Sequence, residues 1–579
     1  MSDIDPHWEF ASLADMLASK ARSRPHECAY VFLDGRGNVA ERRTFAQLDA
    51  AAGRIAAILC ASGFTGKPVV LAYPDGLDFI DALFGCFYAG CIAVPAPYMA
   101  GRRGTERLDA ICGDSSPAAM LTLSRLDEDA AVRGVALHDV PGFRIRTDRL
   151  DHDPRPFVRP PLDSSALALL QYTSGSTSAP KGVMLTHANL LANSAMVRDA
   201  FGHDAHTRGA SWLPLFHDMG LIGHVVNSMH FGGLSVLMSP LTFLQRPLIW
   251  LKAISDWRAT VSGGPTYAFD LCLRRITPEQ AAGLDLSSWT VAYCGSERVH
   301  ADVLDRFAER FAKSGFRRDA LYPCYGLAEA TLFVTGGKSG GGTQSVAAAS
   351  AGAQPIVSCG QAWHDEKVRI VDPDAKAPLS AGSVGEIWVS GANVGQGYWQ
   401  RPAESQMTFK AQLGSDGDTY LRTGDLGFVR DGALYVIGRL KDTIIIRGVN
   451  HAAEDIEATV AASHRAFAEH QGAAFGVEIA GDEHLIVVQE IASFADEAVQ
   501  NAAAELAFES ITRAHGIRLY DLVLVRAHAL PRTLNGKKQR QRCRDLYQAG
   551  GFQRLNARES LRWLGTNLER SSGATPVQP

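Results

Sequence analysis

Short apolar runs that end in small or polar residues recur along the N-terminal part of the chain and alternate with amphipathic segments. The clearest unit joins "PVVLAY" (68–73) to "CIAVPAP" (91–97) through the segment 77–88, which has apolar residues at Leu77, Ile80, Phe84 and Phe87. The helical spacing of these residues predicts a strand–helix–strand unit.

The same pattern returns at "ALALLQYTS" (166–174), "LSVLMSP" (234–240), "ATVSGGP" (259–265) and "TVAYCGSE" (290–297). Strands that alternate with helices indicate an α/β fold, so we expect a large N-terminal domain of mainly parallel sheets flanked by helices. Ligands of such folds bind at the carboxyl ends of the strands, where these Gly/Ser-rich endings lie.

After about residue 355 the strands become shorter and are joined by hairpin-like turns, which predicts a β-barrel-like subdomain over about 356–438 that completes a large domain 1–438. A small mobile α+β domain is expected over 439–565, with a helix at 496–515, followed by a flexible tail 566–579. The Gly/Ala/Ser-rich stretch 336–355 is predicted to be a mobile surface loop.

Charge and cysteine content exclude several classes of function. A net charge of −5 over 579 residues provides no overall field that would attract nucleic acid or an anionic membrane. The ten cysteines occur singly, without the spacing of a zinc site, and the acidic N-terminus does not resemble a signal peptide. The most apolar stretch, 79–94, contains Asp81 and is shorter than the roughly 20 residues that cross a bilayer. We therefore expect a cytoplasmic protein without a membrane span.

The segment "TSGSTSAPKG" (173–182) contains hydroxyl groups, glycines and one lysine, but it lacks the order of a Walker A loop. Alone it could be a solvated turn. Four further motifs follow it in order: "YGLAEAT" (325–331), "YLRTGDLG" (420–427), "GRLKD" (438–442) and "LPRTLNGKKQR" (530–540).

This series resembles the adenylate-forming superfamily of acyl-CoA synthetases, peptide-synthetase adenylation domains and luciferases, over nearly the whole chain. Within it, the sequence is most similar to the fatty acyl-AMP ligases, on "SWLPLFHDMGLIGH" (211–224), "SGGPTYAFDLC" (262–272) and "IIIRGVNHAAEDIE" (444–457). Ala328 occupies a position where CoA synthetases usually have threonine. The resemblance implies activation of a medium- or long-chain fatty acid with ATP and Mg²⁺, then acyl transfer to an acyl carrier protein in polyketide or lipopeptide synthesis.

The resemblance also implies a nucleotide site. Hydroxyl groups and backbone amides of the first motif would hold the β- and γ-phosphates, Tyr325 would stack on adenine, Asp425 would bind the ribose, and Arg439 the ribose or α-phosphate. Glu329 would hold Mg²⁺, since that ion takes one or two protein carboxylates beside phosphate oxygens. The expected ATP-binding residues are Thr173, Ser174, Gly175, Ser176, Thr177, Lys181, Gly295, Ser296, Glu297, Tyr325, Gly326, Ala328, Asp425 and Arg439.

Two catalytic residues are implied. Lys537 would bridge the carboxylate and the α-phosphate while neutralising both, and His217 would lie at the mouth of the acyl tunnel. Lys441 would be the hinge about which the small domain rotates after adenylation. The expected acyl-binding residues are Met219, Ile222, Gly264, Tyr267 and Phe269.

Each of these residues also has an ordinary structural interpretation: Glu329 as a helix-start carboxylate, Asp425 as a turn residue, Tyr325 and His217 as core side chains. Lys441 could pair with its neighbour, and Lys181 could be an exposed loop lysine. The basic run 537–544 could bind nucleic acid, although it has no interleaved aromatic residues, or an acidic carrier protein.

Two features depart from the fatty acyl-AMP ligase pattern. Those enzymes usually carry an ordered insertion after the "YGLAEAT" segment, where this chain has only 336–355, and Ala453 stands where relatives commonly have proline. CoA exclusion is therefore open, and a fatty acyl-CoA synthetase is one alternative. A non-catalytic acyl-binding module is another, and the chain is expected to be a monomer or a module of a larger synthase.

Overall fold

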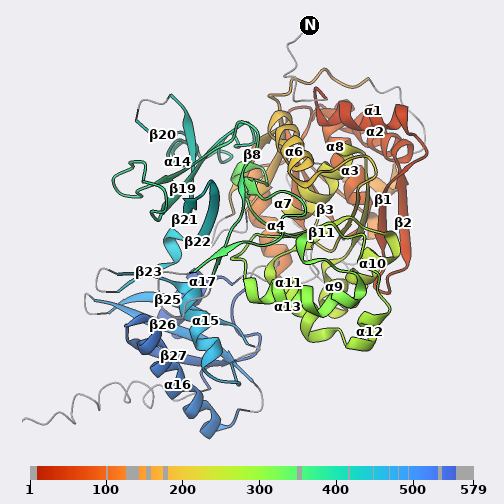
Figure 1. The fold of residues 1–579 in the computed structure, drawn as a ribbon. Coiled ribbons are helices and arrows are strands. Elements are labelled where there is room, and N and C mark those ends of the chain that lie inside the picture. Colours follow the sequence, from red (N-terminus) through yellow and green to blue (C-terminus); the bar gives the residue numbers. More distant parts are fainter. Residues whose placement is uncertain are drawn as a thin grey trace, which may run out of the picture.

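The computed structural model describes residues 10–98, 102–125, 143–150, 158–173, 180–347, 355–414, 417–446, 449–467, 470–479, 482–492, 495–532 and 538–555. Two large, mainly parallel sheets form the N-terminal part, which Figure 1 draws in red to green. An antiparallel sheet and a small C-terminal α+β part lie along one side of it (Figure 1).

The larger sheet has nine strands, in the order β17-β14-β13-β12-β11-β9-β10-β1-β2, and its six central strands run parallel. The strands are β1 (Cys28–Leu33), β2 (Val39–Thr44), β9 (Arg208–Ser211), β10 (Leu234–Met238), β11 (Val261–Gly264), β12 (Val291–Cys294), β13 (Leu321–Tyr325), β14 (Thr335–Gly336) and β17 (Gln361–Ala362).

The second sheet has six strands in the order β6-β5-β3-β4-β7-β8, and only the edge strand β8 is antiparallel. They are β3 (Pro68–Tyr73), β4 (Ile92–Pro97), β5 (Ala119–Thr122), β6 (Phe143–Arg146), β7 (Leu167–Tyr172) and β8 (Gly182–Thr186). The expected mainly parallel α/β fold is confirmed.

Helices cover and separate these sheets (Figure 1). They are α1 (Leu13–Ser23), α2 (Phe45–Ala61), α3 (Asp78–Ala89), α4 (Arg102–Ser115), α6 (His187–Phe201), α7 (Asp218–Gly220), α8 (Asn227–Phe231), α9 (Pro240–Gln245), α10 (Leu248–Trp257), α11 (Thr266–Arg275), α12 (Pro278–Ala282) and α13 (Ala301–Phe311). A π-helical run, η2 (Leu221–Val226), joins α7 to α8.

Helix α3 confirms the predicted helix over 77–88 and is buried along its whole length. Its acidic residue Asp81 receives two bonds from the Nε of Arg43, at 3.0 and 3.3 Å, and burial raises the pKa of this carboxyl to about 6. The apolar stretch 79–94 is thus a core helix followed by β4. In the described part of the chain no helix is long and apolar enough to cross a membrane.

The strands after residue 355 pair antiparallel, in the order β18-β19-β21-β20 with β22 also on β21. They are β18 (Lys367–Val371), β19 (Gly385–Ser390), β20 (Ala411–Gln412), β21 (Thr419–Arg430) and β22 (Ala433–Arg439), and α14 (Pro402–Phe409) packs on this sheet. Among the described strands this order is open, so the barrel-like closure stays a prediction.

The predicted loop 336–355 is partly ordered into short strands. β15 (Ser345–Val346) pairs antiparallel with β16 (Ile356–Val357), and Tyr322 donates a hydrogen bond of 2.7 Å to the carbonyl of Gly337. Residues 348–354 lie outside the described residues. The sequence did not predict this strand pairing because the segment consists mostly of small residues, and the pairing is made by backbone hydrogen bonds.

The C-terminal part has its own hydrophobic core and a three-stranded sheet, β25-β26-β27, with a smaller hairpin β23-β24. Its elements are β23 (Thr443–Ile446), β24 (Val449–Ala452), α15 (Ala453–Ser463), β25 (Gly472–Ile479), β26 (Asp482–Ile491), α16 (Glu497–His515), β27 (Leu519–Arg526) and α17 (Arg540–Gln548). The α+β character and the helix near 496–515 are as predicted; the domain boundaries and the tail 566–579 stay predictions.

Candidate active site

A cavity of about 1250 Å³ lies where the larger sheet, the antiparallel sheet and the C-terminal part meet. Residues from the ends of β7, β12 and β13 line it, together with residues of β21, β22, α15 and the segment before α17. The carboxyl ends of parallel strands therefore open into this cavity, where a ligand of such a fold is expected.

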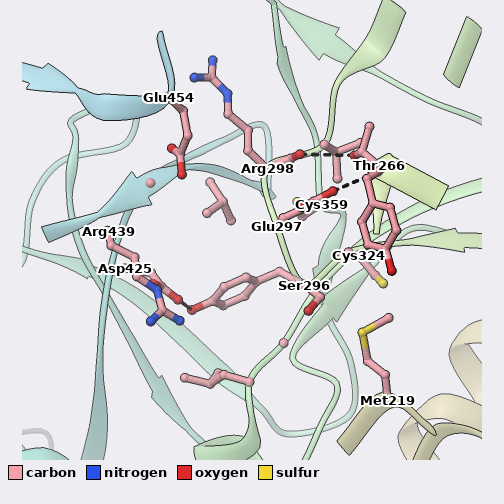
Figure 2. A pocket seen from close by; sticks show the side chains of 18 of the residues that line it. Met219, Thr266, Ser296, Glu297, Arg298, Cys324, Cys359, Asp425, Arg439 and Glu454 are labelled. Atoms are coloured by element: carbon pink, nitrogen blue, oxygen red, sulfur yellow. Dashed lines mark hydrogen bonds and ion pairs between the residues drawn. The ribbon is translucent and has the colours of Figure 1, made fainter. Parts of the chain in front are cut away.

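One wall of the cavity carries a chain of paired side chains. The hydroxyl of Tyr325, the last residue of β13, donates a 2.7 Å hydrogen bond to Oδ2 of Asp425 on β21. Oδ1 of Asp425 lies 3.1 Å from Nε of Arg439, which is its register partner on β22. Figure 2 shows Asp425 and Arg439 on the side of the cavity opposite Ser296 and Met219. The Asp425 carboxylate raises the pKa of the arginine, which stays charged.

The Asp425 carboxylate is buried, yet two contacts leave part of its acceptor capacity unused. A carboxylate can accept about four hydrogen bonds. A pair of neighbouring hydroxyl groups, such as those of a ribose, can therefore still be bound.

Glu329, in the 3₁₀ turn η5 (Ala328–Ala330), lines the same cavity and accepts a 2.9 Å hydrogen bond at Oε1 from the Tyr398 hydroxyl. Burial raises the pKa of this carboxyl. No group of three metal ligands is found among the described side chains. A single hard oxygen donor beside bound phosphates is the protein contribution that Mg²⁺ needs, so the residues present fit this ion.

Residues Ser174, Gly175, Ser176 and Thr177 lie outside the described residues, but the two ends of their segment are well defined. The amide of Thr173 donates a 3.1 Å bond to the carbonyl of Lys181, and Arg107 donates a 3.2 Å bond to the carbonyl of Thr173. Lys181 pairs with Glu404 and lies 5.1 Å from the centroid of the Tyr398 ring. The Glu404 carboxylate thus balances the positive charge of Lys181 in this arrangement.

Beneath this segment, Asp114 joins the hydroxyl of Tyr172, at 2.7 Å, to Arg401, at 2.8 Å. Arg401 also lies 3.5 Å from Glu404, so the ion pair of Lys181 continues into this network. These contacts fix both stems of the segment between the second sheet and α14.

The predicted ATP-binding residues Gly295, Ser296, Glu297, Gly326 and Ala328 all line the cavity. Ser296 has a left-handed φ of 73°, which is uncommon for a residue other than glycine. Oε1 of Glu297 accepts a 3.0 Å hydrogen bond from the amide of Tyr267 at the start of α11. A Cβ on Gly326 would come within 1.7 Å of the Leu332 carbonyl, so only glycine fits this turn between Tyr325 and Glu329.

His217 precedes α7, and its Nδ1 lies 2.5 Å from Oδ1 of Asp218. The strand β7 holds the neighbouring backbone, because Nε2 of Gln171 donates a 3.0 Å bond to the carbonyl of Phe216. His217 and Gln171 line the cavity, and Oε1 of Gln171 is buried without a partner among the described residues. The unpaired Oε1 of Gln171 is an acceptor, so it suits a ligand group that donates a hydrogen bond.

Apolar side chains line another part of the cavity, which we call the apolar arm. They are Met219, Val197, Phe201, Leu332 and Phe333. Of the five predicted acyl-binding residues, Met219 and Tyr267 line the cavity.

The other three predicted acyl-binding residues pack in the core instead. Ile222 and Phe269 are fully buried in two different hydrophobic clusters, and a Cβ on Gly264 would lie 2.8 Å from the Trp212 ring. Ile222 lies in the π-helical run, where the backbone pattern i→i+5 changes which side chains share a face. The sequence could not reveal that change.

Lys537 lies outside the described residues, but the residues on either side of the undescribed segment pair with each other. Arg532 and Lys538 form an antiparallel bridge, and the amide of Gln539 donates a 3.0 Å bond to the carbonyl of Pro531. Lys538, Gln539 and Arg540 line the cavity. The segment that carries Lys537 therefore begins and ends beside the cavity.

Three ion pairs anchor these flanking residues. Arg532 lies 2.7 Å from Glu490, Lys538 pairs with Glu457, and Arg540 binds both oxygens of Glu457 at 2.7 and 2.9 Å. Although burial opposes it, the charges of Arg540 and Lys538 lower the pKa of Glu457 to about 2. This carboxylate is thus charged inside the C-terminal part.

The predicted hinge residue Lys441 belongs to the 3₁₀ turn η6 (Leu440–Asp442) and lines the cavity. Burial lowers the pKa of its ammonium. Asp442 pairs with Arg540 at 3.0 Å, which links the turn to the lysine-bearing segment. A second link joins the two parts directly, because the almost buried Arg298 pairs with Asp455 on α15.

The cavity wall also contains residues that were not anticipated, among them Gln171, Arg298 and Tyr398. Arg298 directly follows the predicted Glu297, and Gln171 lies two residues before Thr173. For Gln171, a polar residue inside the apolar run "ALALLQY" was a signal available in the sequence.

Comparison with known proteins places the chain among adenylating enzymes. The family model described as AMP-binding enzyme matches residues 17–399, and the model described as Disco-interacting protein 2-like, AMP domain, matches residues 441–556.

The medium-chain-fatty-acid–[acyl-carrier-protein] ligase JamA of Moorena producens is 39% identical over 580 residues, which cover 95% of this chain and 97% of JamA. The long-chain-fatty-acid–AMP ligase FadD28 of Mycobacterium tuberculosis is 37% identical, with 94% of this chain and 99% of FadD28 covered.

Among solved structures, a fatty acid AMP ligase from Legionella pneumophila is 36% identical, with a TM-score of 0.73 over 96% of this chain and 99% of that chain. A fatty acyl-adenylate ligase from the same organism, in complex with acyl adenylate and pyrophosphate, has the same identity of 36% and TM-score of 0.73, with 94% and 97% covered.

Proposed function

Because this chain belongs to the AMP-binding enzymes and, within them, to the fatty acyl-AMP ligases, we propose that it joins a medium- or long-chain fatty acid to AMP and then transfers the acyl group to a carrier-protein thiol. The observation that carries this proposal is a single cavity with a polar wall for a nucleotide and an apolar arm for a chain, which meet at His217.

In the first step a carboxylate oxygen of the fatty acid attacks the α-phosphorus of ATP, and the bond from that phosphorus to the pyrophosphate oxygen breaks. Both reactants are anions, so the site must supply positive charge where negative charge accumulates. Arg439 on the polar wall and Lys537 on the C-terminal part are the residues proposed to supply it.

The other residues position the nucleotide. Tyr325 is proposed to stack on adenine, Asp425 to accept the ribose hydroxyls, and the segment from Thr173 to Thr177, with Lys181, to hold the departing pyrophosphate. Glu329 is proposed to hold Mg²⁺, which would neutralise phosphate charge. The hydrogen bond from Tyr398 supports this role, because it orients the carboxylate toward the cavity.

The arrangement of the two parts supports an adenylation geometry. Lys538 to Arg540 border the same cavity as Asp425 and Glu329, which supports the proposal that the adjacent Lys537 acts on bound phosphates. For acyl transfer the C-terminal part, proposed as 439–565, would rotate about Lys441 and withdraw this segment.

For the acyl acceptor we favour the phosphopantetheine thiol of an acyl carrier protein in polyketide or lipopeptide synthesis, since JamA carries the name of an acyl-carrier-protein ligase. CoA is the second candidate, because a relative from Mycobacterium bovis at 36% identity, fadD21, is named a putative fatty-acid–CoA ligase. A cytoplasmic location stays a prediction from the sequence.

The test is pyrophosphate release from ATP across a series of fatty acids of increasing length, followed by product analysis with CoA or with a holo carrier protein. We expect acid-dependent release and an acylated carrier. Efficient acyl-CoA formation would identify CoA as the preferred acyl acceptor. If the folded protein released no pyrophosphate in response to any fatty acid, a non-catalytic binding module would be favoured.

A further inference from the structure

One polar side chain in the apolar arm has no evident structural partner for half of its amide. Asn227 begins α8, directly after the π-helical run, and is 1% exposed. Its Oδ1 accepts a 2.7 Å hydrogen bond from the hydroxyl of the buried Ser194. Its Nδ2 has no hydrogen-bond partner among the described residues, although Asn227 lines the cavity.

The position of Asn227 follows from the helix geometry. Met219, Gly223 and Asn227 all line the cavity and are spaced four residues apart along α7, η2 and α8. Their spacing places them on one side of a nearly continuous helical segment. Asn227 therefore lies about two helical turns beyond Met219, on the side away from His217, which precedes α7.

Among the described side chains of the wall, none hydrogen-bonds Nδ2 of Asn227. The wall residue Tyr293 has its hydroxyl 2.7 Å from Nε2 of His224. Phe201 stacks on Tyr293 at a centroid distance of 6.4 Å and packs edge-on against Phe333 at 5.7 Å. His203 lies against Phe201, with ring centroids 5.3 Å apart.

A bound alkyl chain that fills this arm would exclude water from the amide and leave it unpaired. Buried polar groups are almost always hydrogen-bonded, and an unmet one is costly. Since Ser194 can donate or accept, the free half of the amide is either a donor or an acceptor. A hydroxyl group satisfies both orientations, a keto oxygen satisfies one, and a methylene satisfies neither.

We propose that the preferred fatty acid carries a hydroxyl group on its chain, remote from the carboxyl group, and that Asn227 binds this hydroxyl. The inference rests on the proposed function and deepens it by naming the substrate class. It makes Asn227 a specificity-determining residue that the motifs did not single out.

The experiment measures kcat/KM for pyrophosphate release with dodecanoic acid and with its monohydroxy isomers, substituted near the carboxyl group, in mid-chain or at the terminus. We expect a mid-chain or terminal isomer to exceed the unsubstituted acid by about tenfold to a hundredfold. The isomer substituted next to the carboxyl group should show no such advantage.

Asn227→Leu replaces the amide by an apolar side chain of similar volume. It should lower the ratio of kcat/KM for the hydroxy acid to kcat/KM for the unsubstituted acid to one or below. The matched control is Val197→Ile, which reshapes the same arm without changing its polarity and should leave that ratio high. Should Asn227→Leu destabilise the fold, Ser194→Ala frees the amide from its structural contact and should still discriminate in favour of the hydroxy acid.

The outcomes separate the two proposals. If fatty acids support pyrophosphate release but no hydroxy isomer is preferred, or if the preference survives Asn227→Leu, the role of Asn227 is refuted while the ligase function stands. If no fatty acid, substituted or not, supports release from the folded protein, the proposed function itself fails.

Discussion

The nucleotide wall and the lysine-bearing segment reach the same cavity from opposite parts of the chain, and they are held in different ways. On the wall, Tyr325, Asp425 and Arg439 lie on strands and satisfy one another before any ligand binds. The described flanks of the segment that contains Lys537 are held by ion pairs to Glu457 and Glu490.

This difference suggests a division of labour. Side chains preorganised on paired strands suit ligand binding. A cation on a separately anchored segment suits a contact that forms for one reaction step and is broken before the next. Substitutions in the two regions should therefore change different kinetic constants or stabilities.

The largest effect is expected on stability, from Arg540→Met. The substitution removes three ion pairs and leaves Glu457 buried with Lys538 alone, which should cost about 3–5 kcal/mol at neutral pH. Chemical denaturation followed by fluorescence measures the loss, and a cost below about 1 kcal/mol would refute the anchoring role.

The same variant tests the pH dependence. Because the folded-state pKa of Glu457, about 2, is below its ordinary value of 4.5, its contribution is complete above pH 4.5 and is lost as the pH falls toward 2. The gap in stability between wild type and Arg540→Met should narrow over this range. A gap independent of pH would contradict the assignment of the charge to Glu457.

Lys537→Ala should remove the cation proposed to bridge the carboxylate and the α-phosphate, and should lower kcat for adenylate formation by about 10²–10³-fold, with the fold and ATP binding retained. Pyrophosphate release measures kcat, and equilibrium binding of ATP provides the second readout. Lys538→Ala is the matched control, because that neighbouring lysine pairs with Glu457 and should affect stability more than chemistry.

On the opposite wall, Asp425→Asn should raise the KM for ATP by about tenfold to a hundredfold and change kcat less. The substitution removes the charge that Arg439 faces and weakens acceptance of ribose hydroxyls. Tyr325→Phe, which keeps the ring and loses only the hydroxyl contact, should have a smaller effect. If Asp425→Asn lowered kcat alone, the proposed division between the regions would not hold.

The smallest effect is expected from Arg298→Met, which removes one direct link between the two parts. We expect adenylation to slow about two- to fivefold, with acyl transfer to a carrier spared, because a single ion pair contributes about 1 kcal/mol or less. Separate assays of the two half-reactions give the comparison, and equal slowing of both would argue against a link specific to this arrangement.

The sequence predicted the α/β fold well because alternating apolar runs and helical periodicity report burial directly, as at β3, α3 and β4. Of the described motif residues, those that the resemblance assigned to the nucleotide, such as Thr173, Tyr325 and Arg439, line the cavity. Tyr325 and Arg439 are the last residues of their strands, and Thr173 directly follows β7.

The acyl arm was harder to predict because apolar side chains look alike in a sequence whether they face a ligand or the core. The π-helical run turns Gly223 toward the cavity and leaves Ile222 in the core, and no residue type announces that geometry. Ion pairs such as Arg298 with Asp455 join residues 157 positions apart and were equally inaccessible.

The C-terminal part contributes residues after position 450 to a cavity wall that otherwise comes from residues 171–442. A hybrid protein that took its C-terminal part from a relative would therefore have mismatched residues where the two parts meet at the cavity. Grafting experiments on this scaffold should consequently transplant the facing surfaces as matched sets, with Arg298 and Asp455 exchanged together.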